Sequence, residues 1–272
     1  MLNNKTDSMA RKLFIQKIYG TWKDKKEKVF LSYIKSDGTK EELSYQSFGQ
    51  KCESLAGRFR KSTLCRKDRV LVLTSMSPWG CMAVTALAIS EVVSVVLNPN
   101  LPEEELDSLV DKADISGIVC DEEIYQKYAY KWTQKYPVFN IKTGDLFIDK
   151  KYFSEPSKDR DDDVFAILYS SGTTSEPKGV MITYEAQMKS AELLLRAFGT
   201  NNIRYLLVFP MFHVSGFSVF FCFVFGRRTD WIARKYKLNK INGWIPKVQA
   251  KCIWNGTKSL RNILYEDSKS VK

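Results

Sequence analysis

Histidine is almost absent from this sequence, since His213 is the only one among 272 residues. The six cysteines are widely spaced and form no Cys-x-x-Cys pair. Structural zinc sites and disulfide frameworks require cysteine or histidine at short, recurring spacings, so we expect neither. The first 20 residues mix charges of both signs and contain no apolar stretch typical of a signal peptide. Reduced cysteines and the lack of such a leader favour the cytoplasm as the location.

Acidic residues are scarce only at the end of the chain. Residues 227–272 contain 12 Lys and Arg against 3 Asp and Glu, whereas residues 1–226 contain 30 and 28. The net charge of +11 is therefore concentrated in the last segment. A basic tail can bind nucleic acid or an acidic membrane surface, which stays an alternative here. The tail carries no recognition motif, so we expect no specific nucleic-acid partner.

Charged residues are missing from two longer runs, at residues 70–90 and 205–226. The second run is long enough to span a bilayer. Proline and glycine interrupt both runs, at Pro78 and Gly80 in the first and at Pro210 and Gly216 in the second. We therefore predict two buried strand-turn-helix segments and no transmembrane segment.

Elsewhere β-rich runs alternate with helical patterns, which predicts an α/β fold with a doubly wound, mostly parallel sheet and flanking helices. A hairpin turn is indicated by Asp37-Gly38, and Ser44 is a candidate N-cap. The predicted strands are residues 29–34, 41–44, 70–73, 92–97, 115–119, 164–169 and 206–209. The predicted helices are residues 13–22, 45–60, 78–89, 102–113, 125–136 and 183–198.

The segment from Leu168 to Val180 has a composition suited to phosphate binding. Glycine lets backbone amides approach an anion, serine and threonine add hydroxyl donors, and Lys178 supplies a compact positive charge. A nucleotide-binding P-loop is excluded, because Lys178 precedes Gly179 and no hydroxyl follows it. From composition alone, a surface turn between a strand and a helix is an equal alternative.

The order of residues 170–180 resembles the signature loop of the adenylate-forming superfamily, which includes the acyl- and aryl-CoA synthetases. The family pattern is [ST]-S-G-T-T-G-x-P-K-G-V, and this sequence departs from it only at Ser175. We refer to residues 170–180 as the signature loop. The resemblance implies that the loop surrounds the β- and γ-phosphates of ATP and that Lys178 pairs with them. The implied binding residues are Ser170, Ser171, Gly172, Thr173, Thr174, Lys178 and Gly179.

A second segment, Phe-Pro-Met-Phe-His-Val-Ser-Gly at residues 209–216, is similar to the aromatic-histidine motif of the same superfamily. A lone histidine beside aromatic residues is more often structural. The motif instead implies that His213 lies beside the substrate carboxylate, so Lys178 and His213 are the candidate catalytic residues and no metal ligand is assigned. Two positions depart from the family: Glu91 replaces a common glycine, and Tyr184 replaces a common histidine.

The resemblance implies ATP-dependent activation of a fatty or aryl acid as an acyl-adenylate, followed by thioester formation with CoA. ATP, Mg²⁺ and CoA are the expected cofactors. The resemblance covers residues 1–226, which we interpret as a partial AMP-binding N-terminal domain. Residues 227–272 form a basic tail of non-family character. A shifted reading frame and disorder are open explanations for this tail. Because the later motifs are missing, we expect this chain to be inactive alone. The alternative is a non-catalytic pseudoenzyme or nucleotide-binding fragment.

Overall fold

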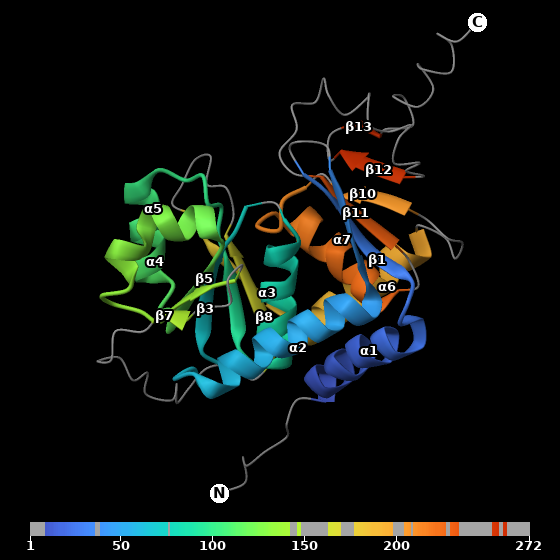
Figure 1. Cartoon of the computed structure of the whole chain (residues 1–272), viewed down its shortest axis with the longest axis horizontal. Coiled ribbons are helices and arrows are strands. Elements are labelled where there is room, and N and C mark those ends of the chain that lie inside the picture. The colour runs from blue at the N-terminus through green and yellow to red at the C-terminus, as the bar shows by residue number, and fades with distance from the viewer. Residues whose placement is uncertain are drawn as a thin grey trace, which may run out of the picture.

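The computed structural model shows two β-sheets with helices between them and on the outer face of one sheet (Figure 1). The structure describes residues 9–35, 39–75, 77–141, 146–147, 163–169, 177–197, 204–207, 209–226, 229–233, 252–255 and 258–259.

The first sheet has seven strands in the order β7-β6-β5-β3-β4-β8-β9 among the described residues. Its inner strands β6, β5, β3, β4 and β8 run parallel, while β7 and β9 pair antiparallel at the two edges. The strands are β3 (Arg69–Leu73), β4 (Val93–Val96), β5 (Gly117–Cys120), β6 (Val138–Asn140), β7 (Leu146–Phe147), β8 (Val164–Tyr169) and β9 (Gly179–Thr183).

The second sheet has six strands in the order β13-β12-β10-β11-β1-β2. Strand β11 lies between β10 and β1 and runs parallel to both, and β1 pairs antiparallel with β2. The strands are β1 (Val29–Ile34), β2 (Lys40–Ser44), β10 (Arg204–Leu207), β11 (Thr229–Ala233), β12 (Cys252–Asn255) and β13 (Lys258–Ser259). Three of these strands thus come from the basic segment after Gly226, where the sequence predicted no element.

The helices divide between the two faces of the seven-stranded sheet. Helices α4 and α5 cover its outer face, and α2 and α3 lie on the face toward the six-stranded sheet (Figure 1). The helices are α1 (Met9–Lys25), α2 (Tyr45–Lys61), α3 (Pro78–Ile89), α4 (Glu103–Lys112), α5 (Glu122–Trp132), α6 (Tyr184–Ala197) and α7 (Val214–Phe225). No helix in the described part of the chain is both long and apolar enough to cross a membrane.

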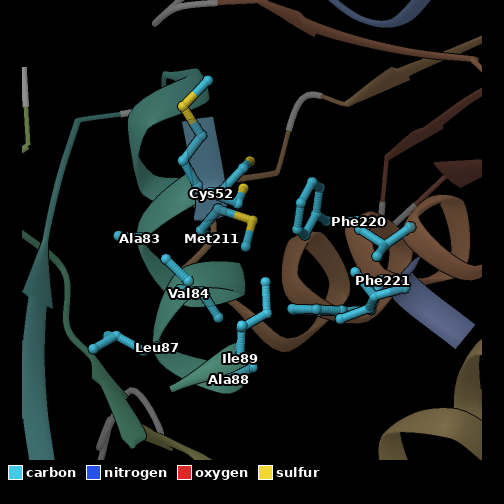
Figure 2. Close-up of a cluster of buried hydrophobic side chains, with 14 of the residues drawn as sticks. Cys52, Ala83, Val84, Leu87, Ala88, Ile89, Met211, Phe220 and Phe221 are labelled. Carbon is cyan, nitrogen blue, oxygen red and sulfur yellow. The ribbon is translucent and has the colours of Figure 1, made fainter. Parts of the chain in front are cut away.

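Strand β3 shows how the hydrophobic core is divided. Successive side chains of a strand point to opposite faces, so Val70 and Val72 enter one buried cluster while Leu71 and Leu73 enter another. The larger cluster lies between the two sheets and includes almost all of α3 and α7. Figure 2 shows Val84 and Ile89 on the side of α3 that faces Phe220 and Phe221 of α7. The first long uncharged run is therefore a buried strand and helix, as predicted, and helix α7 of the second run is largely buried from Gly216 to Val224.

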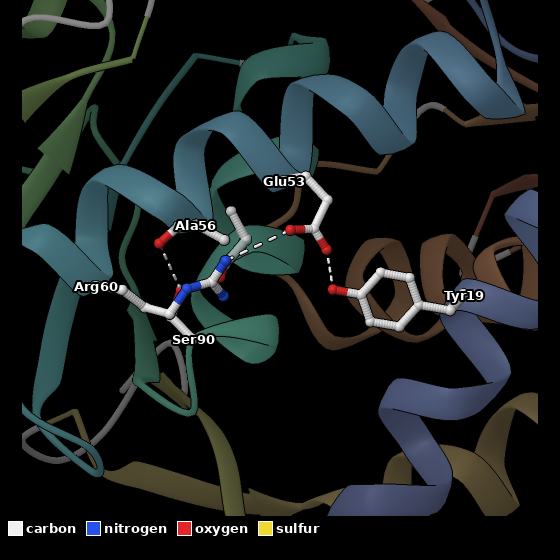
Figure 3. A network of polar contacts seen from close by, with 6 residues as sticks. Tyr19, Glu53, Ala56, Arg60 and Ser90 are labelled. Atoms are coloured by element: carbon white, nitrogen blue, oxygen red, sulfur yellow. Dashed lines mark hydrogen bonds and ion pairs between the residues drawn. The ribbon is translucent and has the colours of Figure 1, made fainter.

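Polar contacts connect α1 to α2 and α2 to the end of α3 (Figure 3). The Tyr19 hydroxyl donates a hydrogen bond to the Glu53 carboxylate, which also pairs with Arg60 at 3.4 Å. The Ser90 hydroxyl donates to the carbonyl oxygen of Ala56 at 3.3 Å. These exposed or half-exposed contacts orient the helices and involve none of the candidate site residues.

Most predicted elements of the first 140 residues are confirmed, including α3 and β1 at their predicted bounds. Ser44 is the N-cap of α2, and its side chain accepts a hydrogen bond from the Ser47 amide at 3.0 Å. Helix α5 begins at Glu122 rather than at residue 125, because Asp121 accepts from the Ile124 amide and caps the helix. The predicted turn at Asp37-Gly38 lies outside the described residues.

Candidate functional site

Lys178 lies just beyond the carboxyl end of β8. Strands β8 and β9 pair antiparallel, and Tyr169 and Gly179 are partners at the carboxyl end of β8. The signature loop thus connects two adjacent, hydrogen-bonded strands, and its final residues are held by the sheet. Lys178 and Gly179 are exposed at this edge. The remaining predicted phosphate-binding residues lie outside the described part of the chain: Ser170, Ser171, Gly172, Thr173 and Thr174.

Gly179 is closely packed at this position. A Cβ atom there would lie 3.1 Å from Ile167 Cγ2 and 3.3 Å from Tyr169 Cζ, distances shorter than ordinary van der Waals contacts. The absence of a side chain therefore lets β9 pair closely with the end of β8. Lys178 directly precedes Gly179 in the sequence. The pairing of Gly179 with β8 therefore fixes the position of the Lys178 backbone at the start of β9.

His213 is the N-cap of α7. Its Nδ1 accepts a hydrogen bond from the Ser215 amide at 3.2 Å, and its ring stacks on Phe209 with centroids 5.7 Å apart. The side chain is exposed, whereas Met211 of the same motif is buried in the core near α3 (Figure 2). The motif therefore anchors itself through Met211 and presents His213 at the surface.

The cap determines which hydrogen-bonding group His213 offers. A ring nitrogen that accepts a hydrogen bond carries no proton, so in the neutral imidazole the proton resides on Nε2. In that tautomer Nε2 is an N–H donor, which can bind a carboxylate oxygen. The structural role of the histidine and the predicted role beside a substrate are compatible, because they use different nitrogens.

The parallel strands of the two sheets have their carboxyl ends on the same side of the molecule. Residues at the carboxyl ends of β1, β3 and β5 line one cavity, so the parallel strands of both sheets end together there. The signature loop follows the carboxyl end of β8, and residues 209–213 follow β10. We infer that Lys178 and His213 lie on this common side, which is where open α/β sheets bind their ligands.

The two departures from the family pattern have structural explanations. Glu91 has a φ of 61°, a conformation that favours glycine. Its carboxylate is 36% exposed and pairs with Arg66 at 2.7 Å and with Arg11 of α1 at 3.5 Å. The carboxylate therefore has both exposure and partners.

Tyr184 is a core residue. It packs in a cluster of aromatic rings with Phe14 of α1 and Phe165 of β8, with centroids 5.0 Å and 5.4 Å away. Burial strongly raises the pKa of its hydroxyl. Tyr184 is therefore neutral and joins α6 to the sheet from within the core, away from solvent.

The sequence analysis missed a polar contact at the same edge of the seven-stranded sheet. Asp121 follows β5, is buried, and its Oδ2 accepts hydrogen bonds from the Ser75 amide at 2.7 Å and the Ser75 hydroxyl at 2.6 Å. The positions of both residues directly after buried strands could have indicated this contact. Among the described residues, no group of three or more His, Cys, Asp or Glu side chains could hold a metal ion.

The family model described as AMP-binding enzyme matches residues 20–269. This range extends past Gly226, and the division of the chain at that residue stays a prediction. The 2-succinylbenzoate–CoA ligase of Bacillus cereus strain Q1 is 29% identical over 182 residues, which are 66% of this chain and 36% of that protein.

Solved structures share the fold. O-succinylbenzoate coenzyme A synthetase from Bacillus subtilis in complex with AMP superposes with a TM-score of 0.74 at 20% identity, covering 92% of this chain and 64% of that one. A long-chain-fatty-acid-CoA ligase from Archaeoglobus fulgidus gives a TM-score of 0.76 at 19% identity, covering 94% and 54%. The chain spans only about a third of the length of the curated Bacillus cereus relative, 36%.

Proposed function

The chain belongs to the AMP-binding enzyme family, and we propose that it corresponds to the N-terminal part of an acid–CoA ligase. Such an enzyme would activate a carboxylic acid with ATP and transfer the acyl group to CoA. The observation that carries the proposal is the signature loop, whose lysine leaves the sheet at the β8–β9 pair. The curated relatives named as 2-succinylbenzoate–CoA ligases make 2-succinylbenzoate the first acid to test.

In the proposed reaction, a carboxylate oxygen attacks the α-phosphorus of ATP and pyrophosphate leaves. The sulfur of CoA then attacks the acyl carbon, and AMP leaves as the thioester forms. Neither step requires a covalent bond to the protein, so catalysis depends on positioning and on neutralising phosphate charge.

Lys178 is assigned to the triphosphate, where an ammonium group can follow the charge that moves to the leaving pyrophosphate. The hydroxyls and backbone amides of Ser170, Ser171, Gly172, Thr173 and Thr174 would surround the same phosphates. His213 would donate from Nε2 to an oxygen of the acid and hold it near the α-phosphate.

Mg²⁺ is proposed to accompany the nucleotide. Magnesium sites of this kind use phosphate oxygens and waters with one or two carboxylates, so a preformed cluster of acidic side chains is not required. When bound, the ion neutralises phosphate charge, and Lys178 acts on the phosphates beside it.

The test compares ATP binding by the chain and by two lysine variants. Lys178→Ala should weaken binding about tenfold, a loss typical of one charge-assisted hydrogen bond. Lys61→Ala is the matched control. Lys61 is an exposed lysine at the end of α2, just before β3, and therefore lies toward the amino ends of the parallel strands, away from the signature loop. Equal affinity of Lys178→Ala and the unaltered chain, measured by calorimetry, would contradict the assignment.

A second candidate is nucleotide binding without catalysis, because the chain matches only 36% of the length of the Bacillus cereus relative. Acid-dependent exchange of pyrophosphate into ATP is the measurement that can exclude the second candidate. ATP binding without exchange is expected for this chain by itself. Robust exchange with 2-succinylbenzoate would establish catalysis and remove the second candidate.

A further inference from the structure

A cavity of about 560 Å³ lies at the carboxyl ends of β1, β3 and β5. This volume is within the range of small-molecule sites. The described residues that line it come from the β1–β2 pair, α2, α3 and the start of α5, and none of these belongs to the described part of the signature loop or to the 209–216 motif. Strand β8, which leads into the signature loop, lies two strands away from β3, about 10 Å across the sheet.

The cavity lies at the topological switch point of the seven-stranded sheet. From β3 the chain crosses to β4 on one side, and it then returns to β5 on the other side of β3. The connections that leave β3 and β5 therefore diverge and open a crevice at their carboxyl ends. Ligands of open α/β sheets bind in such crevices.

Carboxylates dominate the charged lining. Asp121, Glu122, Glu123 and Glu41 line the cavity together with two lysines, Lys35 and Lys51. Lys35 pairs with Glu41 at 3.3 Å, and the Lys51 ammonium lies 6.0 Å from the centre of the Trp79 ring. The remaining three carboxylates are at the start of α5, where they already complement the positive end of the helix dipole. The lining as a whole therefore favours a positively charged ligand.

The floor of the cavity is aromatic. Trp79 and Tyr33 line it and offer flat aromatic surface to the apolar part of a ligand, while the Lys51 ammonium already lies over the Trp79 ring. Ser77 is 5% exposed, and its hydroxyl has no hydrogen-bond partner in the structure although it occupies the N-cap of α3. A buried hydroxyl without a partner beside a cavity indicates a polar group of the ligand as its partner.

We propose that this cavity binds an organic amine whose alkyl body lies over Trp79 and whose ammonium groups face Asp121 and Glu123. A metal ion is a poorer match, since the described carboxylates do not converge on a metal position. No described lining residue belongs to the proposed adenylation site, so we expect the ligand to bind without competing with ATP.

Calorimetric titration of the 272-residue chain with spermidine tests the proposal. We expect one molecule to bind per chain. Trp79→Leu should weaken binding about fivefold through loss of the flat aromatic surface that covers the alkyl body of the ligand. Glu123→Gln, an exposed position with little effect on folding, should weaken it about threefold through loss of one charge pair. Glu104→Gln is the matched control, because it removes the same charge from an exposed position on α4.

Several results would overturn the proposal. These are no spermidine binding, an equal loss in Glu104→Gln and Glu123→Gln, or complete displacement of spermidine by Mg²⁺ at matched ionic strength. The last two would show a general attraction of polyamines to surface charge. If circular dichroism shows that Trp79→Leu does not fold, Glu123→Gln and its control decide the outcome. ATP affinity should be the same in all these variants.

Discussion

Replacement of Gly216 by alanine should destabilise the protein, although the residue lies in a helix. A Cβ atom at Gly216 would lie 2.3 Å from the carbonyl oxygen of Pro210 and 2.6 Å from that of Phe209. Both neighbours are backbone atoms, which cannot rotate away as a side chain can. The substitution therefore requires the segment before α7 to move, and that segment carries His213.

The magnitude follows from two opposing terms. Alanine is favoured over glycine inside a helix by about 0.5–1 kcal/mol. Overpacking in a rigid environment costs about 1–3 kcal/mol. We therefore expect a net loss of about 1–2 kcal/mol in the free energy of unfolding, together with weaker binding of any ligand that contacts His213.

Gly57 in α2 provides the matched control. No atom lies within 4 Å of a Cβ built there, so Gly57→Ala should stabilise the protein by about 0.5–1 kcal/mol. Urea unfolding followed by circular dichroism measures both variants under the same conditions. If Gly216→Ala is as stable as Gly57→Ala, the close approach between residues 209–210 and α7 does not limit this position, and the argument is wrong.

Three further outcomes can be measured directly. Glu91→Gln should lose about 1 kcal/mol because the ion pair with Arg66 is removed, and Glu91→Gly should recover about 1 kcal/mol by relieving the left-handed backbone; equal stability of both variants in urea would contradict this. Ser44→Ala should cost about 1 kcal/mol in urea unfolding through loss of the α2 cap, and an unchanged midpoint would show that the cap contributes little. Burial raises the pKa of the Cys52 thiol well above its usual value, so alkylation in mildly alkaline solution, followed by mass spectrometry, should label the partly exposed Cys65 first; earlier labelling of Cys52 would count against its burial.

Local patterns predicted much of the first half of the fold. The apolar stripe of α2, with Phe48 and Cys52, the Ser44 cap and Pro78 at the start of α3 are all local signals, and each is confirmed. Strand β9 was missed because its five residues, Gly179–Thr183, are held by pairing with β8, a contact that depends on the fold around it. The three strands after Gly226 were missed for the same reason, since β11 is stabilised by neighbours on both sides.

The candidate site, like the fold, was predictable from the sequence only in part. The order of residues 170–180 and 209–216 was sufficient to indicate the family, and the matching family model confirms it. The sequence left open whether His213 was structural. The structure shows that its Nδ1 caps α7, which leaves Nε2 for a ligand. The cavity beside Asp121 could not be predicted, because its walls come from segments far apart in the chain.

The sequence by itself therefore determined the family and the alternation of strands and helices, and it marked Lys178 and His213 as candidate site residues. Such features depend on residue type and on short spacings along the chain, and both can be read directly from the sequence. Only the tertiary structure decided that Glu91 pairs with Arg11, that Tyr184 belongs to the core, and that Gly216 and Gly57 respond oppositely to alanine. Each of these depends on which atoms from distant segments lie within a few ångströms, and no local pattern encodes that distance.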